Sequence, residues 1–257
     1  MDRERDRPGT DLNEPAPGIS RDGDYFDQLV HESGDFNPFT DHGWRTLARR
    51  FAAAVPVQAK LGILDVGCGT GQSRQIYLER SSQYVGLDLS LGALSVARGR
   101  FEGSSWVQAD ALRLPFGDCS FEVVAFSSVL HHIADFGAAL AAARRVLRPG
   151  GWVFAFDPNL LHPALLLFRH PRSPLYKPQG VSPDEKPMAP RVLREAFEEA
   201  GFTAIGQRCQ SDIPYRAVAV KTLDALLPIY NRVDWLWEKI GMGRWFGSFV
   251  VTWARKP

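Results

Sequence analysis

Short apolar runs alternate with longer amphipathic stretches through the middle of this chain. The apolar runs, each of a length suited to a buried strand, lie at 62–66, 84–89, 106–109, 122–127 and 152–157. Stretches with helical periodicity lie between them, near 71–80, 91–102 and 136–147. Strands and helices that alternate in this way are typical of parallel strands joined by helical crossovers. The pattern therefore predicts an α/β fold with a mostly parallel sheet.

The pattern changes on both sides of this middle part. Residues 1–23 are charged and rich in proline and glycine, which is the composition of a disordered tail. An aromatic-rich segment with a helix near 41–54 follows, and we expect 24–58 to form an N-terminal cap over a site. Past the fifth strand, the proline-rich segment 158–190 predicts an irregular insertion on the substrate side.

The rest of the chain completes one domain, which we place at 24–257. RPGG at 148–151 predicts the end of the third helix, because proline cannot continue a helix and glycine adopts the left-handed turn after it. Further helices are expected near 189–200 and 217–240, and a last strand at 247–256.

Composition restricts the classes of function. The chain has 257 residues and is 45% hydrophobic, which is ample for a folded core. Its 30 basic residues nearly cancel its 29 acidic ones, so no overall field favours nucleic acid or an anionic membrane. The three cysteines form no CxxC pair, no signal peptide is evident, and no apolar run approaches the roughly 20 residues of a membrane span. We expect a cytoplasmic protein with a small-molecule substrate and no integral membrane segment.

Three glycines directly follow the first predicted strand, at Gly67, Gly69 and Gly71. Glycine is favoured where the backbone takes positive φ or where a ligand comes close to it. The dinucleotide-binding fingerprint GxGxxG requires a glycine where this chain has Gln72. Asp65, just before the loop, would face the negative charge of a pyrophosphate. The loop therefore predicts a ligand with a cationic end.

Two further carboxylates follow predicted strands. Asp88 ends the second strand, where a carboxylate can accept both hydroxyls of a ribose. Asp110, followed by Ala111, ends the third and offers an acceptor for an exocyclic amine. Together they suit an adenosine attached to an amino acid. As alternatives, Asp88 caps the helix that begins near Leu91, and Asp110 lies in a solvated loop.

Five motifs occur in order between about 60 and 157: DVGCGTG, GLDLS, QADALRLPF, VLHHI and LRPGG. They resemble the ordered motifs of the class I S-adenosylmethionine-dependent methyltransferases, particularly the type 11 group. The resemblance implies a Rossmann-like seven-stranded sheet with helices on both faces and an antiparallel last strand, for which GSFVVTWARK at 247–256 is in the expected place. It also implies S-adenosyl-L-methionine as the cofactor.

The resemblance assigns cofactor contacts to residues at or just after the strand ends. Those that resemble contacts to the methionine end and the sulfonium are Asp65, Gly67, Cys68, Gly69, Gly71 and Ser127. Those that resemble contacts to the ribose and the adenine are Asp88, Leu89, Asp110 and Ala111. Cys68 lies near a predicted helix start that would favour a thiolate, but we interpret it as a small residue in a tight turn.

His131 and His132 follow the fourth strand, where the family often has substrate-facing groups. An imidazole can take a proton from a hydroxyl near neutral pH, so both are candidate catalytic bases. In the alternative, one histidine packs and the other binds a backbone carbonyl. A metal pair is not expected, because adjacent side chains diverge and no Cys or Glu nearby completes a site.

DPNL at 157–160 loosely resembles the DPPY motif of amino-group nucleic-acid methyltransferases, but it lacks the second proline and the aromatic residue and follows the fifth strand. We therefore expect no nucleic-acid substrate. Asp157 and Asn159 still end a central strand, so contact with another substrate is a hypothesis for both. The aromatic residues around Trp235, Trp237 and Trp245 are interpreted as core or lid packing, with an interfacial patch for a lipid-linked substrate as the alternative.

These observations predict S-adenosylmethionine-dependent methyl transfer to a small or lipid-linked metabolite, with O-methylation of a sugar or secondary-metabolite hydroxyl as the first choice. One alternative is a non-catalytic module that binds S-adenosylmethionine to regulate a partner. An NAD-dependent oxidoreductase is the second alternative, and Gln72 and Asp65 argue against it.

Overall fold

The computed structural model describes residues 22–35, 37–56, 60–170, 172–174, 176, 182, 185–186, 188–217 and 221–257. The first described element is helix α1, Asp22–Ser33. Two residues of the predicted tail at 1–23 therefore belong to a helix, and residues 1–21 lie outside the described part of the chain. Part of the predicted insertion at 158–190 also lies outside it.

One seven-stranded sheet has the order β3-β2-β1-β4-β5-β7-β6. Its strands are β1 Leu61–Val66, β2 Ser81–Asp88, β3 Ser105–Gln108, β4 Phe121–Ser127, β5 Leu147–Pro158, β6 Thr203–Gln210 and β7 Phe249–Arg255. Strands β1 to β5 pair in parallel, whereas β7 runs antiparallel to both β5 and β6. The predicted α/β sheet with an antiparallel last strand is confirmed.

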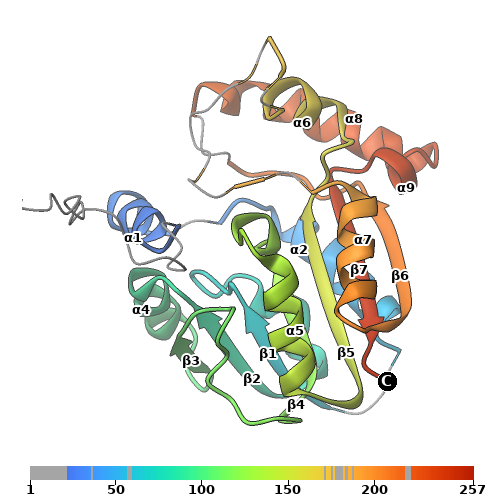
Figure 1. Ribbon diagram of the computed structural model, residues 1–257. Coiled ribbons are helices and arrows are strands. Elements are labelled where there is room, and N and C mark those ends of the chain that lie inside the picture. The colour runs from blue at the N-terminus through green and yellow to red at the C-terminus, as the bar shows by residue number, and fades with distance from the viewer. Residues whose placement is uncertain are drawn as a thin grey trace, which may run out of the picture.

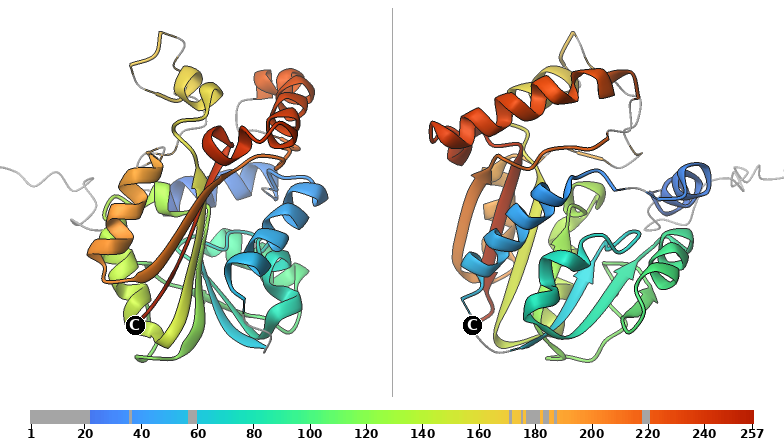
Figure 2. Two further views of the ribbon diagram at one scale, coloured as in Figure 1. Left: turned by 90° about the vertical axis from the view of Figure 1, so that its right-hand side faces the viewer. Right: turned by 180° about the vertical axis from the view of Figure 1, so that it is seen from behind.

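Helices cover both faces of the sheet (Figure 2). The remaining elements, with short 3-10 helices labelled η, are α2 Asp41–Ala54, α3 Arg74–Tyr77, η1 Leu78–Arg80, α4 Leu91–Arg100, η2 Leu130–His132, α5 Phe136–Val146, α6 Pro163–Phe168, α7 Pro190–Glu199, η3 Lys221–Leu226, α8 Leu227–Lys239 and α9 Gly243–Phe246. Side chains of Thr40, Ser90 and Asp135 cap α2, α4 and α5 by accepting a backbone N–H three residues on.

Each central strand buries both of its faces, which explains its continuous apolar run. Leu64 and Val66 of β1 join the core that α5 and α7 cover, whereas Ile63 joins the core under α2, α3 and α4. The period of two in a strand sends successive side chains to opposite faces. The strand ends, where the polar motif residues lie, are therefore fixed by two buried cores.

Two predicted boundaries need correction. The helix expected at 71–80 is only the four residues of α3 followed by η1, because Gly71 has φ +81° and the side chain of Ser73 bonds to Asp65 instead of capping. The RPGG sequence ends α5 as predicted, but β5 already begins at Leu147. Backbone bonds join Gly150 and Gly151 to Lys256, so this segment extends the strand.

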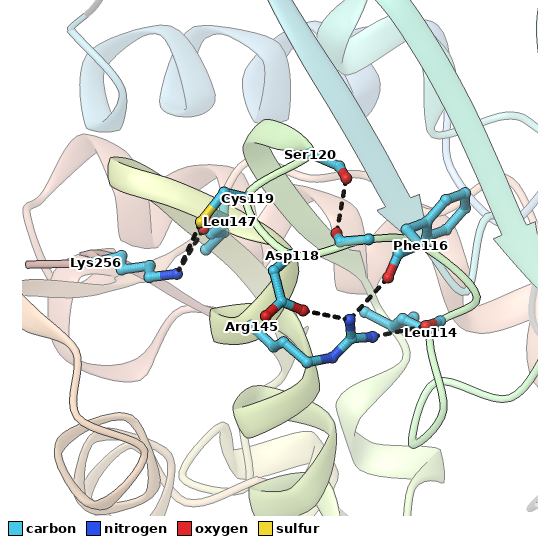
Figure 3. A network of polar contacts seen from close by, with 9 residues as sticks. Leu114, Phe116, Asp118, Cys119, Ser120, Arg145, Leu147 and Lys256 are labelled. Carbon is cyan, nitrogen blue, oxygen red and sulfur yellow. Dashed lines mark hydrogen bonds and ion pairs between the residues drawn. The ribbon is translucent and has the colours of Figure 1, made fainter.

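The segment that leads from Asp110 to β4 is tied to the C-terminal end of α5 (Figure 3). The guanidinium of Arg145 donates to the carbonyls of Leu114 and Phe116 at 2.7 and 2.8 Å and pairs with Asp118 at 2.9 Å. Because arginine is a planar donor with several N–H groups, one side chain fixes three points of the loop. This anchors the segment that begins at Asp110.

Helices α6, α8 and α9 lie together beyond the carboxyl ends of the central strands, and α1 lies beside α4 (Figure 1). The part of the chain that the structure describes contains no helix both long and apolar enough to span a bilayer.

Candidate active site

The glycine loop after β1 has three left-handed residues with different surroundings. Gly67, Gly69 and Gly71 have φ of +72°, +52° and +81°. A Cβ on Gly67 would lie 2.4 Å from the side chain of Val129, and one on Gly71 would lie 2.7 Å from Trp106. A Cβ on Gly69 would meet nothing within 4 Å. Two glycines thus allow close packing, and the middle one leaves open space beside the loop.

The first backbone N–H groups of this loop bond within the protein, although those of a glycine-rich turn before a helix commonly point toward a ligand. The N–H groups of Gly67 and Cys68 donate to the carbonyl of Leu87 at 2.8 and 3.1 Å, and that of Gly69 donates to Asp88 Oδ2 at 2.7 Å. The loop is therefore bonded to the end of β2, and this brings the Asp88 carboxylate beside it.

Asp88 is held by backbone donors on both oxygens. Oδ2 accepts from Gly69 N, and Oδ1 accepts from Ser90 N at 2.9 Å. Each carboxylate oxygen has two lone pairs, so capacity for hydroxyl donors remains. Burial raises the pKa of Asp88. The alternative that Asp88 caps α4 is wrong, because the Ser90 hydroxyl accepts the N–H of Ala93.

Asp65 lies fully buried beneath the loop. Its carboxylate accepts three hydroxyl hydrogen bonds, from Ser73 at 2.6 Å, Tyr84 at 2.7 Å and Ser127 at 2.5 Å. Burial raises the pKa of Asp65 to about 6, so the group is mostly charged at neutral pH. Its direct contact with a methionine end stays a prediction, but a negative charge under the loop favours a cation above it.

Ser127 ends β4 next to a strained turn. It is nearly buried, and its hydroxyl also bonds to Tyr77 at 2.8 Å. Ser128 has φ +58°, which is unusual for a residue with a side chain, and its N–H donates to Phe156 at 2.9 Å. Left-handed residues of this kind gather at functional sites. The turn redirects the chain from β4 toward the two histidines.

The adenine-side candidates lie at the neighbouring strand ends. Asp88 pairs with Gln108 in register, and the N–H of Ala109 donates to the Asp88 carbonyl at 3.1 Å, which puts Asp110 at the same edge. Asp110 Oδ1 accepts from Leu112 N at 2.9 Å, so this carboxyl forms a local turn. Ala111 packs half-buried against the core. Leu89 packs against Gly23 of α1, and a Cβ on Gly23 would lie 3.0 Å from the Leu89 side chain.

His131 and His132 have different partners. His131 is nearly buried, with its Nδ1 2.8 Å from Asp157 Oδ1, which also accepts the His131 backbone N–H at 3.1 Å. His132 Nδ1 lies 2.7 Å from Ser182 Oγ, and its ring contacts Phe26 of α1. The two rings lie 3.9 Å apart between centroids.

Two acidic residues of the N-terminal segment escaped the motif analysis. Asp27 Oδ1 accepts from Ser90 Oγ at 2.5 Å and from Gly92 N at 2.8 Å. Asp35 accepts from Thr70 Oγ1 at 2.7 Å and Gln72 Nε2 at 3.2 Å. Both lie in a charged stretch without a motif, so no local signal separates them from surface carboxylates. They hold α1 and the turn after it against the glycine loop and α4.

Two other interpretations are decided by burial. Cys68 is buried, and burial together with Asp88 and Asp65 raises its thiol pKa well above the ordinary value, which supports a packed turn residue and not a nucleophile. Asn159 is also buried, with its side chain bonded to the backbone of Gly247 at 2.8 Å and Leu161 at 3.0 Å. Asn159 is therefore a structural residue at the end of β5.

The aromatic segment near the C-terminus differs from its predicted packing. Trp237 is half-buried against His162, as lid packing requires. Trp235 and Trp245, however, are 44% and 62% exposed, and Phe246 is 41% exposed. Packing is therefore wrong for these three side chains. Arg169 is half-buried, Arg172 is exposed, and Lys177 lies outside the described residues.

These residues fit an S-adenosylmethionine site. Open space beside Gly69 gives room at the loop, a buried negative charge lies beneath it at Asp65, and Asp88 and Asp110 follow along the same edge. These residues lie at the carboxyl ends of parallel strands, which is the edge where open α/β sheets bind ligands.

Comparisons with known proteins agree with this geometry. A family model described as a methyltransferase domain matches residues 64–155. The demethylmenaquinone methyltransferase of Renibacterium salmoninarum is 37% identical, over 49% of this chain and 51% of its own. The ubiquinone/menaquinone biosynthesis C-methyltransferase UbiE of Desulfotalea psychrophila is 29% identical, over 74% and 84%. The O-methyltransferase cnsE of Penicillium expansum is 35% identical, over 56% and 52%.

The chain spans about half the length of two of these relatives. Among solved structures, the [4+2]-cyclase SpnF has the same fold, with a TM-score of 0.61 and 18% identity over 95% of this chain and 98% of SpnF. The matched segment contains the glycine loop and all five motifs. Residues 64–155 are therefore a methyltransferase domain, in agreement with the resemblance to the class I S-adenosylmethionine-dependent methyltransferases.

Proposed function

We propose that this protein transfers a methyl group from S-adenosylmethionine to a hydroxyl-bearing small or lipid-linked metabolite in the cytoplasm, with His131 as the general base. Our first candidate reaction is O-methylation of a sugar or secondary-metabolite hydroxyl. The observation that carries the proposal is the hydrogen bond between His131 Nδ1 and the buried Asp157 carboxylate, 2.8 Å long.

The position of His131 supports this role. It lies two residues beyond Val129, whose side chain fills the space beside Gly67, so the end of β4 packs directly on the glycine loop. Asp157 holds both the ring and the backbone N–H of His131. A ring fixed through Nδ1 presents Nε2 as the atom that takes a proton from an acceptor hydroxyl. Asp157 acts through His131 and is a positioning residue.

Each group has a distinct task in this reaction. S-adenosylmethionine, when bound, supplies a methyl group already activated on its sulfonium. Asp88 and Asp110 are proposed to hold the ribose and the adenine, and the glycine loop with Asp65 the methionine end. Positioning the acceptor in line with the methyl group is worth roughly 7 to 11 kcal/mol. His131 then matters for acceptors that are weak nucleophiles until they lose a proton.

The protonation of this pair sets a pH dependence. Burial raises the pKa of Asp157 to about 8, and its Oδ2 has no hydrogen-bond partner among the described residues. Below that pH the Asp157 carboxyl is protonated. His131 is an effective base only when Asp157 is charged and Nδ1 carries the hydrogen. The rate should therefore rise as pH rises through about 8.

His132 has a different role in this proposal. Its Nδ1 lies 2.7 Å from Ser182 Oγ and its ring contacts Phe26 of α1, so its partners differ from the Asp157 carboxylate that holds His131. His132 therefore serves as the matched control for His131.

A second candidate is C-methylation of a phenolic or hydroquinone ring, which the name of the similar UbiE protein favours. Removal of a phenolic proton also activates the neighbouring ring carbon. The same base supports either product, and only the acceptor geometry decides between them.

The test is methyl transfer from labelled S-adenosylmethionine to a panel of sugars, phenols and hydroquinones, with products located by NMR. His131→Gln should lower kcat about 10²- to 10⁴-fold while S-adenosylhomocysteine binding is unchanged. His132→Gln should stay within about tenfold. Asp157→Asn should remove the rise in rate near pH 8.

Two results would contradict parts of this proposal. A His131→Gln enzyme as active as the wild type rules out the base. Transfer to none of the acceptors, with tight S-adenosylhomocysteine binding, favours the non-catalytic module. The fold does not decide this point, since a [4+2]-cyclase shares it.

A further inference from the structure

Helix α8 and the two residues that flank it, Leu226 and Ile240, expose an unbroken apolar stripe. Its members, one on each turn at alternating spacings of three and four, are Leu226, Ile229, Val233, Leu236 and Ile240, with exposed fractions of 51%, 66%, 45%, 47% and 58%. Residues with this spacing share one side of a helix. A soluble surface helix normally turns such a side toward the core. We call these five residues the α8 stripe.

The side of α8 next to the stripe packs on the protein. Asp234 is buried and accepts the N–H of Asp212 at 2.8 Å. The rings of Tyr230 and Trp237 contact His162, which directly precedes α6. These contacts hold one side of α8 inward, while the α8 stripe beside it stays exposed.

The apolar surface continues onto the neighbouring helices. Trp245 of α9 is 62% exposed, and Leu166 and Leu167 of α6 are 41% and 42% exposed. All three helices lie at the same end of the molecule (Figures 1 and 2). Exposed apolar patches that span several elements mark interaction surfaces.

The charges that accompany this surface are of one sign. Between 226 and 246 the exposed charged residues are Arg232, Lys239 and Arg244. The carboxylates of the same segment turn inward: Asp234 is buried, and Glu238 pairs with Arg208 at 2.9 Å. The near-zero net charge of the chain thus hides a local cationic surface.

Two of these cations lie over exposed tryptophans. Lys239 Nζ is 5.8 Å from the ring of Trp235, and the guanidinium of Arg244 is 5.4 Å from that of Trp245. Tryptophan beside lysine or arginine, next to an apolar stripe, is the composition of helices that lie in the interface of a bilayer.

We propose that the α8 stripe, with the exposed parts of α6 and α9, docks on an anionic lipid surface. The apolar side chains would enter the acyl boundary, and the three cations would meet lipid phosphates. A second copy of the chain is the weaker fit, because the same three cations would face one another across the contact.

Docking here would bring the active-site edge to the lipid. Asn159, two residues beyond Asp157, bonds to Gly247 directly after α9, so the patch is joined to the end of β5. This part of the inference rests on the proposed function and narrows it to an acceptor dissolved in, or linked to, lipid.

The test is flotation with vesicles of phosphatidylcholine, with and without phosphatidylglycerol. The wild type should float with the anionic vesicles, and less so at about 0.5 M salt, where charges are screened. The double variant Ile229→Ser with Leu236→Ser should bind about tenfold more weakly or worse. Lys239→Glu with Arg244→Glu should lose the preference for the anionic lipid.

Val192→Ser on α7 is the matched control, since Val192 is 48% exposed and lies outside the patch. It should bind like the wild type, and unchanged S-adenosylhomocysteine affinity should show that every variant is folded. Failure of the wild type to bind anionic vesicles, or equal binding by the Ile229→Ser/Leu236→Ser variant, overturns the proposal. So does a wild-type dimer in sedimentation that the same two substitutions dissociate, because the stripe then covers a second copy.

Vesicle binding needs neither cofactor nor acceptor, so its failure is distinguishable from failure of the proposed function. Vesicle binding without methyl transfer would support the lipid-docking surface and contradict the proposed enzymatic function. Methyl transfer to a water-soluble acceptor without vesicle binding would support the enzymatic function and overturn the lipid-docking surface.

Discussion

The two halves of the sheet edge are built differently. Around β1 and β2, the buried carboxylate of Asp65 accepts three hydroxyls, and Asp88 is bound by two backbone N–H groups. Beyond β5, His162 is buried with no partner on Nδ1 among the described residues, and burial lowers its pKa to about 4. There α8 turns its apolar side outward. The first half has the fixed geometry that a cofactor site requires, whereas the second leaves an apolar surface exposed, which we propose docks on lipid.

The glycine loop offers the sharpest test of fixed geometry in the first half. Gly67→Ala should lower the free energy of unfolding by about 3 kcal/mol, because it combines a left-handed φ with a Cβ 2.4 Å from Val129. Gly69→Ala should cost only about 1 kcal/mol, from φ alone, but should weaken S-adenosylhomocysteine binding by filling the open space. Urea unfolding and calorimetric titration measure the two effects. Equal losses of stability would show that the two glycines do not differ as their surroundings indicate.

The buried charge of Asp65 predicts a pH effect of about 2 kcal/mol. Its pKa is raised to about 6 in the folded state, so the folded protein binds a proton more readily than the unfolded chain. The stability that this proton provides is present at acid pH and is lost as pH rises through about 6. Asparagine at this position has no charge to bury. The free energy of unfolding of Asp65→Asn, relative to that of the wild type, should therefore be about 2 kcal/mol higher at pH 7 than at about pH 4.5. Urea unfolding at both pH values measures this change, and a constant difference would contradict the raised pKa.

A smaller effect, about 1 kcal/mol, is expected where α1 meets the loop. Asp35 is half-buried and bonds to Thr70 and Gln72 and pairs with Arg100 at 2.9 Å. Burial alone would raise its pKa, but Arg100, Thr70 and Gln72 outweigh burial and lower it. Asp35→Ala should weaken S-adenosylhomocysteine binding by about 1 kcal/mol, since the cap over the loop loosens.

Glu32→Ala is the matched control for Asp35→Ala. Its carboxylate is exposed and accepts a hydrogen bond within α1, from Gln28 at 2.8 Å. Calorimetric titration should give the wild-type affinity for this control. If Asp35→Ala also matches the wild type, the N-terminal segment is not part of the cofactor site.

The first half was largely predictable from the sequence because its signals are local. A buried strand followed by Gly67, Gly69 and Gly71 defines a loop without reference to the rest of the chain. Asp88 and Asp110 follow apolar runs directly, so their edge of the sheet could be deduced. The length of α3 could not, because it depends on a hydrogen bond from Ser73 to Asp65.

Contacts over long sequence separations account for what was missed elsewhere. In the sequence, Asp27 cannot be distinguished from a surface carboxylate. The packing of α1 on α4 brings it to Ser90. Trp235 and Trp237 are two residues apart in an apolar segment, so hydrophobicity alone assigns both to packing. The contact of Trp237 with His162 shows that this tryptophan, unlike Trp235, lies on a side of α8 that faces inward.

The most direct test of the cofactor site is calorimetric titration with S-adenosylhomocysteine, compared between wild type and Asp88→Ala. A micromolar dissociation constant, about −8 kcal/mol, is expected for the wild type, with no binding of NADH. Asp88→Ala should bind about 10- to 100-fold more weakly, because hydrogen bonds to a charged group are worth about 1.5 to 3 kcal/mol. Asp118→Ala, which removes an exposed carboxylate paired with Arg145, should bind like the wild type. Equal affinity for Asp88→Ala, or binding of NADH in place of S-adenosylhomocysteine, would contradict the assignment of this edge of the sheet to S-adenosylmethionine.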